Sequence, residues 1–542
     1  MATGSARTAI VIDTPPTSNG DLHIGHIAGP FINADAHARY LRAAGRDVVF
    51  SSGTDDSQTY VLASARRKGM RPEDLCGRSW QEIRHSLEMM GISLDGFAPY
   101  DDRYRASVLE FVGALYRAGK FERRTVRLPW SERTGEFLVE GLISGYCPVC
   151  LVDSRGGLCE SCGHPNNYDE LLQQQSTVDT DDPLTTRETE ILVLPMEQYR
   201  QQLVEFYEQR QHRMRPHTVQ LVRELLAKPL PDFPITYPIG WGIPAPFEET
   251  PDQRLNAWVE GIPAVMYCTA FAADTSRGPV EGQADDELWR AEHDAEIIYF
   301  IGFDCVWFWG LTHVALLMAH EGRYVLPDTI ITNEFYELEN NKLSTSLGNV
   351  LYTTDLLTEV SRDAIRFYLS LSNPEHQRTN FSRAALDKVV AQRLITPWDR
   401  LAAVLNKVIE QNGADRELPV SAAARERAAA VLARFRVCYE LESYSLTRAA
   451  DLIVAQTDRL LRAAQALDPA SYGSALADLV LEVRALVCGA SPILIDLAAA
   501  ASAAGGFGIR LDQAVVDVTS VTPFPVPTFD AAASSVRDTQ CG

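Results

Sequence analysis

The sequence predicts an α/β protein: a nucleotide-binding domain on a parallel sheet, interrupted by a metal-binding insertion and followed by an all-α helical bundle. Residues 8–13 (TAIVID) form an apolar run typical of a buried strand, and the turn-rich PPTSNGD leads from it into a helix near His23. Four cysteines cluster at 147–162, and an Ala-rich helical pattern starts near Asp363. Strand, loop and helix at the start of a chain are typical of nucleotide-binding α/β domains.

Bulk composition limits the class of protein. A chain of 542 residues is too long for one core, and 46% hydrophobic with 23% charged residues is typical of soluble proteins. The net charge of -22 gives no global attraction to nucleic acid, so such a partner would need a local basic face. The first sixteen residues lack a signal-peptide pattern, and charged or polar residues interrupt the apolar stretch 297–319. We therefore expect a cytoplasmic protein without a membrane span.

The order of patterns along the chain predicts the domain organisation. Residues 47–52 (DVVFSS) read as a second strand before the polar loop GTDDSQ, and WGIPAP and NAWVEG read as later strand-like segments. The sequence from about 114 to 234, which lies between GTDDSQ and WGIPAP, is polar and rich in Cys and Gln and predicts an insertion. The expected parts are 1–113 and 235–350 (two halves of the nucleotide-binding domain), 114–234 (insertion with a zinc knuckle), 351–385 (linking segment), 386–505 (helical domain) and 506–542 (extended tail).

The cysteine cluster predicts a structural zinc site. Cys147, Cys150, Cys159 and Cys162 have the spacing CxxC-x8-CxxC, with glycines in the linker. Each CxxC turn can present two thiolates to one tetrahedral ion, and four thiolates leave no open position for catalysis. Ten cysteines in all, six of them scattered, fit a reducing compartment better than a disulfide framework.

Two further motifs suggest phosphate binding. His23-Ile24-Gly25-His26 lies where the first helix begins, and a helix N-terminus offers unpaired N–H donors to a triphosphate. Two polar surface histidines are the simpler alternative. The stretch 341–350 (NKLSTSLGNV) looks like a loop that grips phosphate with two lysines, but only Lys342 is present and Thr345 stands in the second place. The chain has only six lysines, so the retention of Lys342 favours a role in ATP chemistry.

Together these motifs resemble the class I aminoacyl-tRNA synthetases, and among them the methionyl-tRNA synthetases, over about residues 8 to 505. TPPTSNGDLHIGH is similar to the first signature of that family, GTDDSQ to its second, WGIPAP and WVEG to its middle strands, and KLSTS to its ATP-binding loop. The resemblance implies a Rossmann-type catalytic domain, a helical domain like those that bind anticodons, and ATP-dependent formation of an aminoacyl-adenylate.

The resemblance also implies roles for individual residues. His23 and His26 would face the phosphates and Lys342 the leaving pyrophosphate, with Mg²⁺ accompanying ATP and one structural Zn²⁺ in the knuckle. The expected ATP site comprises Pro16, Asn19, Gly25, Gly302, Asp304, Ser344, Thr345 and Ser346. The expected amino-acid site comprises Pro15, Thr17, Asp56, Trp258, Gly261, Val265, Cys305 and Trp309, with Asp56 pairing with the substrate ammonium.

The sequence departs from the methionine enzymes where substrates are chosen. Thr17 and Val265 stand where aromatic residues are usual, Trp309 stands where a histidine is usual, and Cys305 replaces a branched apolar residue. A thioether is held by apolar and aromatic contact, so these changes should remodel the pocket. In the helical domain, Ala466-Leu467 replaces a Pro-Trp pair, and 389–407 lacks the expected Asn spacing, which should weaken anticodon recognition.

These departures favour a specialised paralogue that activates an amino acid other than methionine for a small-molecule acceptor. Similar synthetase-like modules occur in hydrazine synthetases, and a cupin partner would here be a separate protein. Thr345, which removes a cation from the loop, fits release from fast turnover coupled to tRNA. The first alternative is an authentic methionyl-tRNA synthetase that charges tRNA. The second is an inactive tRNA-binding or regulatory module.

Overall fold

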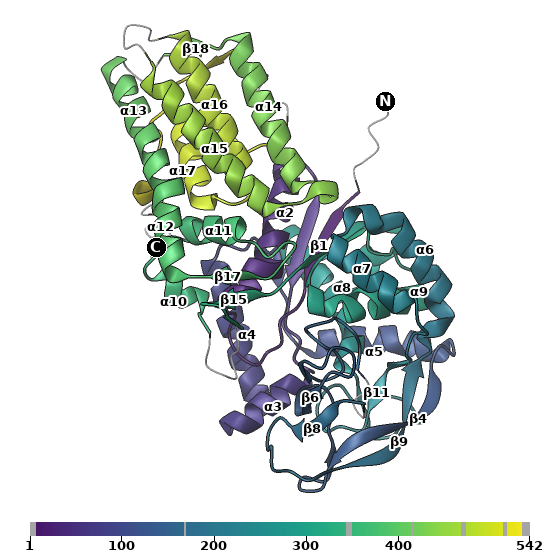
Figure 1. Cartoon of the computed structure of the whole chain (residues 1–542). Helices are drawn as coiled ribbons and strands as arrows, with labels where there is room; N and C mark the ends of the chain where they lie inside the picture. The colour runs from purple at the N-terminus through teal and green to yellow at the C-terminus, as the bar shows by residue number, and fades with distance from the viewer. Residues whose placement is uncertain are drawn as a thin grey trace. The chain divides into compact units, whose positions relative to one another are not determined.

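The computed structural model describes residues 7–166, 170–342, 350–412, 416–467, 473–512 and 517–533 (Figure 1). The chain forms two units by its internal contacts. The first unit contains Met1–Leu22, Val49–Ser86 and Leu94–Glu334, and the second contains His23–Val48, Leu87–Ser93 and Phe335–Gly542. Each unit therefore combines segments that are far apart in the sequence.

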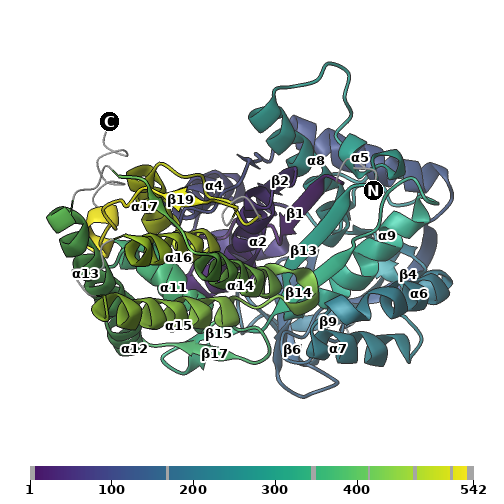
Figure 2. The ribbon, with the colours of Figure 1, turned by 90° about the horizontal axis from the view of Figure 1, so that it is seen from above.

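The first unit is built on a five-stranded sheet with strand order β14-β13-β1-β2-β3. The strands are β1 (Ala9–Asp13), β2 (Val48–Ser52), β3 (Gly96–Phe97), β13 (Glu296–Gly302) and β14 (Thr329–Asn333). β1 pairs in parallel with β13, as do β13 with β14 and β2 with β3, and Figure 2 shows β2, β1, β13 and β14 side by side. Every residue of β1 and β2 is buried, which explains the apolar runs AIVI and VVF that begin these strands. The sheet confirms the predicted α/β fold class.

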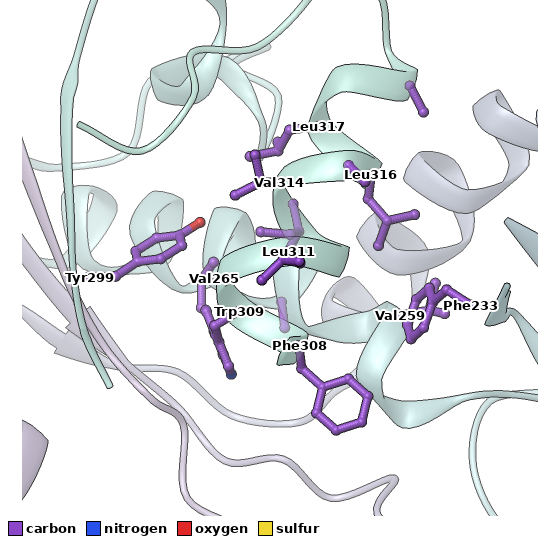
Figure 3. Close-up of a cluster of buried hydrophobic side chains, with 14 of the residues drawn as sticks. Phe233, Val259, Val265, Tyr299, Phe308, Trp309, Leu311, Val314, Leu316 and Leu317 are labelled. Atoms are coloured by element: carbon purple, nitrogen blue, oxygen red, sulfur yellow. The ribbon is translucent and has the colours of Figure 1, made fainter. Parts of the chain in front are cut away.

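The first unit also contains helices in the segments that connect these strands. They are α3 (Thr59–Lys68), α4 (Pro72–Met89), α5 (Asp102–Arg117), α8 (Ala257–Arg277) and α9 (His313–Ala319), the last continuing the π-helical η8 (Val306–Thr312) and following the short η7 (Phe303–Cys305). Residues of α8, β13, η8 and α9 form one hydrophobic cluster, in which Val265, Tyr299 and Trp309 are labelled in Figure 3.

The prediction of strands at WGIPAP and NAWVEG was wrong. NAWVEG begins α8, and the Asn256 side chain caps that helix by accepting a hydrogen bond from the Trp258 backbone N–H. WGIPAP lies between two-residue strands, β11 (Thr236–Tyr237) and β12 (Arg254–Leu255), and contributes only a bridge at Pro244. Six apolar-rich residues do not distinguish a strand from a buried helix turn, and in this chain the Asn256 cap begins a helix.

The insertion lies in the first unit and has its own sheets. A long antiparallel ladder joins β4 (Glu122–Ser131) to β9 (Leu184–Leu194), with β5 (Glu136–Phe137) and β10 (Phe233–Pro234) at its sides. A smaller sheet contains β6 (Ile143–Tyr146), β7 (Asp153–Arg155) and β8 (Leu172–Ser176). Helices α6 (Arg200–Arg210) and α7 (Pro216–Leu226) follow the ladder.

The second unit is mostly helical, as predicted. It contains α1 (Ile24–His26), η1 (Ile27–Phe31) and α2 (Ile32–Ala43), and then α10 (Thr353–Leu357), α11 (Arg362–Leu371), α12 (Arg383–Val390) and η10 (Ala391–Ile395). Its bundle consists of α13 (Thr396–Asn412), α14 (Ala422–Tyr439), α15 (Leu446–Gln465), α16 (Ser474–Ala490) and α17 (Ile495–Gly505) (Figure 1). A small sheet joins β15 (Tyr336–Leu338) to β16 (Asn341–Lys342) and β17 (Thr379–Phe381).

The described part of the C-terminal tail is largely extended up to Thr528, is helical at residues 529–533, and packs on α13. Its strand β19 (Ser520–Val521) pairs with β18 (Leu418–Pro419). Asn406 exchanges two hydrogen bonds with the backbone of Val526, at 2.9 and 2.8 Å. Trp398 Nε1 donates to Pro527 O at 2.8 Å, and its ring is buried. Trp398 therefore acts in packing within the bundle.

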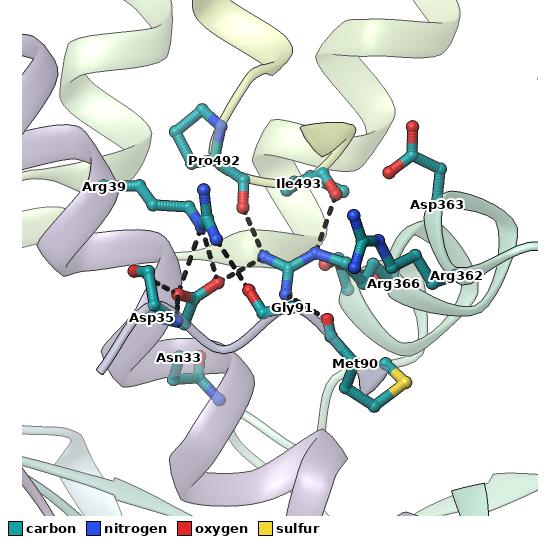
Figure 4. A network of polar contacts seen from close by, with 12 residues as sticks. Asn33, Asp35, Arg39, Met90, Gly91, Arg362, Asp363, Arg366, Pro492 and Ile493 are labelled. Carbon is teal, nitrogen blue, oxygen red and sulfur yellow. Dashed lines mark hydrogen bonds and ion pairs between the residues drawn. The ribbon is translucent and has the colours of Figure 1, made fainter. Parts of the chain in front are cut away.

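A buried ion pair connects α2 to α11 within the second unit (Figure 4). Arg366 donates to Asp35 at 2.6 Å and to the carbonyls of Met90, Pro492 and Ile493, and neither side chain of the pair is exposed. Burial alone would raise the pKa of Asp35, but the charges of Arg39 and Arg366 lower that pKa to about 2.

No helix in the described part of the chain has the length and apolar character needed to span a bilayer.

Candidate active site

The loops that follow β1 and β2 are joined at the carboxyl ends of these strands. Asp55 N donates to Pro16 O at 2.9 Å, and Thr17 forms a parallel bridge with Asp55. Ser18 Oγ donates to Asp56, whose backbone carbonyl accepts from Trp241 Nε1. Ligands of open α/β sheets bind at such an edge. The structure thus brings Pro16, which the sequence analysis assigned to the ATP site, next to Thr17 and Asp56, which it assigned to the amino-acid site.

Asp55, which the sequence analysis did not select, has the less satisfied carboxylate of the two. Gln58 Nε2 donates to Asp55 Oδ2 at 2.8 Å, but Oδ1 is buried without a hydrogen-bond partner in the described part of the chain. Burial, and then the negative charges of Asp56 and Glu140, raise the pKa of Asp55 to about 7. The Asp-Asp pair in GTDDSQ was the available signal, and only the fold shows which carboxylate keeps a free oxygen.

A second carboxyl group lies near this loop. Glu260, on the first turn of α8, is buried and accepts a hydrogen bond from Tyr104 Oη at 3.3 Å. Burial and the charge of Asp55 raise the pKa of Glu260 well above its usual value. Burial therefore favours the protonated form of the Glu260 carboxyl group beside the Asp55 loop. A glutamate in an apolar helix segment was the only sequence signal for this residue.

The end of β13 carries the predicted ribose-binding residues Gly302 and Asp304. A Cβ atom on Gly302 would lie 2.4 Å from Asp304 Oδ1, so only glycine allows the carboxylate to fold against the backbone there. Cys305 follows in the same short helix, and burial raises the pKa of its thiol well above the usual value. A neutral, buried thiol contributes packing instead of nucleophilic chemistry.

The wall of the predicted amino-acid site is formed by α8 and by η8 with α9 (Figure 3). The rings of Trp258 and Phe308 stack at 3.9 Å, and His313 Nε2 donates to Trp258 O at 2.7 Å. A Cβ atom on Gly261 would lie 2.3 Å from His313 Cε1, so glycine is needed for this close approach. The sequence analysis missed His313, which lies one helical turn after Trp309 and is fully buried.

The histidines of HIGH form a self-contained cap in the second unit. Their rings stack with centroids 3.8 Å apart. His23 Nδ1 accepts from Gly25 N at 3.1 Å, and His26 Nδ1 accepts from His23 N at 3.3 Å. Burial lowers the pKa of His26 to about 4. Burial, and then the neighbouring His26, lower the pKa of His23 well below its usual value. Both rings are thus neutral, with Nε2–H left as the donor.

The loop predicted to bind pyrophosphate is described only at its start. Lys342 pairs with Glu337 through the backbone of β16. The Lys342 side chain and residues 343–349, including Ser344, Thr345 and Ser346, lie outside the described residues. In the first loop, Asn19 N donates to Thr17 O at 2.8 Å, and Asn19 O accepts from Lys68 Nζ at 3.0 Å, so Asn19 holds the loop shape. Pro15 belongs to the same loop.

The four clustered cysteines converge on one point. The Sγ atoms of Cys147, Cys150, Cys159 and Cys162 all lie within 4.8 Å of one another. The separations Cys147–Cys162 and Cys150–Cys159 are 3.9 and 3.5 Å, and sulfur atoms bound tetrahedrally to one Zn²⁺ are about 3.8 Å apart. Both the donor type and the spacing fit a closed zinc site, with Cys147 and Cys150 between β6 and β7 and with Cys159 and Cys162 after β7.

Comparisons with known proteins identify relatives of this chain. A family model described as "tRNA synthetases class I (M)" matches residues 10–407. The methionine–tRNA ligase of Roseiflexus sp. (strain RS-1) is 32% identical over 404 residues, covering 73% of this chain and 67% of that protein. The corresponding ligase of Kineococcus radiotolerans is 30% identical over 419 residues, covering 73% of this chain and 68% of its own length.

A solved structure shares the fold. Mycobacterium tuberculosis methionyl-tRNA synthetase in complex with methionyl-adenylate superposes with a TM-score of 0.73 at 21% identity. The alignment covers 97% of this chain and 99% of that one.

Proposed function

Since the chain belongs to the class I tRNA synthetases of the M type and is a ligase of the aminoacyl-tRNA synthetase kind, we propose that it forms an aminoacyl-adenylate from an amino acid and ATP. The names of its relatives make methionine the first candidate amino acid and tRNA the first candidate acceptor. They give no support to a small-molecule acceptor or to a separate cupin partner.

The observation that carries this proposal is the buried Asp55 carboxylate at the carboxyl end of β2. Its Oδ1 has no partner in the described part of the chain, and burial holds its pKa near 7. A substrate ammonium would supply both the hydrogen bond and the opposite charge. Asp56, which the sequence analysis assigned to this role, already accepts from Ser18, so Asp55 is the better receptor of the two.

Activation needs positioning more than proton transfer. The substrate carboxylate is already ionised and attacks the α-phosphate in line, and pyrophosphate leaves. His23 and His26 would donate through Nε2–H to phosphate oxygens as neutral groups, because each Nδ1 accepts a backbone N–H. ATP brings Mg²⁺, which neutralises phosphate charge when bound. Lys342 would face the leaving pyrophosphate.

A specialised paralogue that uses another amino acid is the second candidate. One observation favours it: the wall of the amino-acid site contains buried N–H and O–H groups without partners in the described part of the chain, at Trp258, Trp309 and Tyr299. A thioether is a poor partner for such groups. An inactive tRNA-binding module would have no need of the Asp55 arrangement.

ATP–pyrophosphate exchange with each of the twenty amino acids tests the proposal. Exchange that depends on one amino acid supports it, and charging of tRNA with methionine alone would make methionine and tRNA the natural substrates. Exchange with another amino acid and no charging would favour the specialised paralogue. Absence of exchange with every amino acid, in a protein shown to be folded and to contain zinc, would contradict amino-acid activation.

A further inference from the structure

The wall of the amino-acid site holds a concentration of buried polar atoms without hydrogen-bond partners in the described part of the chain. They are Trp309 Nε1, Tyr299 Oη and His313 Nδ1, and each side chain is at most 3% exposed. Buried polar side chains in native proteins nearly always have a partner, so each exception needs an explanation. Two of these atoms, Trp309 Nε1 and His313 Nδ1, belong to residues one helical turn apart, where a ligand could supply the missing hydrogen bonds.

These atoms belong to rings that touch one another. The Tyr299 and Trp309 rings meet edge to face with centroids 5.4 Å apart, and the Trp309 and His313 rings meet at 4.7 Å. Figure 3 shows the indole nitrogen of Trp309 directed away from Leu311 and Val314, toward the side of the cluster where no aliphatic side chain is labelled. Trp309 and His313 are four residues apart in η8 and α9 and so lie on one helix face.

The two ring nitrogens have opposite roles. Trp309 Nε1–H can only donate. His313 Nε2 must carry a proton, since it donates to Trp258 O at 2.7 Å, and burial lowers the pKa of His313 to about 4. The neutral ring therefore leaves Nδ1 as an acceptor. An unsatisfied donor and an unsatisfied acceptor thus lie on neighbouring rings.

We propose that Trp309 and His313 make the amino-acid site selective for a side chain ending in an uncharged group that both accepts and donates a hydrogen bond, such as a hydroxyl or a carboxamide. The oxygen would accept from Trp309 Nε1–H, and the O–H or N–H would donate to His313 Nδ1. This inference rests on the proposed amino-acid activation and narrows its substrate class.

The chemistry of the wall argues against the two other kinds of side chain. A thioether is a weak acceptor with no donor, so methionine would leave His313 Nδ1 unsatisfied. A charged terminus would lose its hydration beside Trp309 and His313, whose side chains are buried. An uncharged polar terminus satisfies both rings without that cost.

The test is ATP–pyrophosphate exchange by the full chain with substrates of similar length: methionine, norleucine, glutamine and 2-amino-5-hydroxypentanoic acid. We expect kcat/KM for glutamine or the hydroxy acid to exceed that for methionine and norleucine by about tenfold or more. A tenfold preference for methionine or norleucine would overturn the inference while leaving amino-acid activation intact. Exchange with no amino acid at all would overturn both.

Trp309→Phe removes the indole N–H but keeps an aromatic ring. We expect it to raise KM for the oxygen-bearing substrates about tenfold more than KM for norleucine, so that the preference for them falls about tenfold. Trp398→Phe is the matched control, because its indole N–H bonds to Pro527 O in the helical bundle; it should leave the preference unchanged. An equal loss with all four substrates in Trp309→Phe would assign Trp309 a packing role and overturn the inference. The wild-type comparison decides the question even if this variant fails to fold.

Discussion

At the scale of single residues, Asp55 illustrates how burial prepares a charge for a ligand. The carboxylate is enclosed at the end of β2, near Asp56 and Glu140, and this environment raises its pKa to about 7. Because the folded pKa lies above the unfolded one, the unfolded chain loses this proton at lower pH than the folded protein, and stability falls as pH rises from about 4 to 7. A substrate ammonium reverses that effect by pairing with the ionised form.

Amino-acid binding should therefore depend on pH. As pH rises through about 7, Asp55 loses its proton and KM for the amino acid should fall. Asp55→Asn should raise KM about 10- to 100-fold above pH 7.5, the effect of losing one charge-assisted hydrogen bond, and should flatten this pH profile. The measurement is ATP–pyrophosphate exchange from pH 5.5 to 8.5.

The control for this experiment is Asp102→Asn, because the Asp102 side chain is fully exposed on α5. It should reproduce the wild-type pH profile. An Asp55→Asn enzyme with an unchanged KM and the same profile would show that another group, with Asp56 as the first candidate, binds the ammonium.

At the scale of elements, the helix that follows HIGH shows how a break in regular structure is stabilised. η1 contains Pro30, and Gly29 has non-helical dihedral angles, so the backbone carbonyls before them lose their helical partners. Asn33 Nδ2 donates to Gly29 O at 2.6 Å, and Asn373 Nδ2 donates to Ala28 O at 2.8 Å. Both asparagines lie in the second unit, and their spacing in the sequence gives no indication of this joint role.

The buried pair of Arg366 with Asp35 should be the most sensitive point in the packing of α2 on α11 (Figure 4). Arg366→Met leaves a buried carboxylate and three backbone carbonyls without their donor, so we expect a loss of about 3–5 kcal/mol of local stability. Native-state amide exchange in α2 and α11 measures it.

Arg71→Met is the surface control, because the ion pairs of Arg71 with Glu73 and Asp74 are exposed. Its exchange pattern should match that of the wild type. Unchanged protection of α2 and α11 in Arg366→Met would mean that apolar packing alone holds these two helices together.

At the scale of the whole molecule, the zinc module has little apolar core of its own. The module exposes Tyr146 at the end of β6 and Val149, Leu151 and Val152 in the turn before β7, and each arm of the module is shorter than an independently stable hairpin. Metal binding should therefore supply much of the folding free energy of the module, while the parallel sheet depends on its own buried strands.

Removing the metal should unfold this module selectively. The purified protein should contain about one zinc per chain, and strong chelation or Cys150→Ser should increase amide exchange across residues 143–166 while β1, β2 and β13 stay protected. Elemental analysis and hydrogen exchange are the measurements. Full protection of 143–166 in a zinc-free protein would show that the module folds without metal.

Much of this protein follows from its sequence alone. The parallel strands are readable because strands buried on both faces need continuous apolar runs, and β1, β2 and β13 have them. The zinc site can be predicted from the four cysteines because a tetrahedral ion requires thiolates at such a spacing. Family membership follows from motifs whose order is a property of the chain.

Only the tertiary structure shows the hydrogen-bond partners and the burial of individual side chains. Asp55 and Asp56 are adjacent in sequence, and only the loop geometry shows that Ser18 occupies the second and leaves an oxygen of the first unsatisfied. NAWVEG became a helix through its Asn256 cap. His313 lies against Gly261 because α9 packs on α8. Burial and hydrogen bonding depend on neighbours distant in sequence, so these assignments required the folded chain.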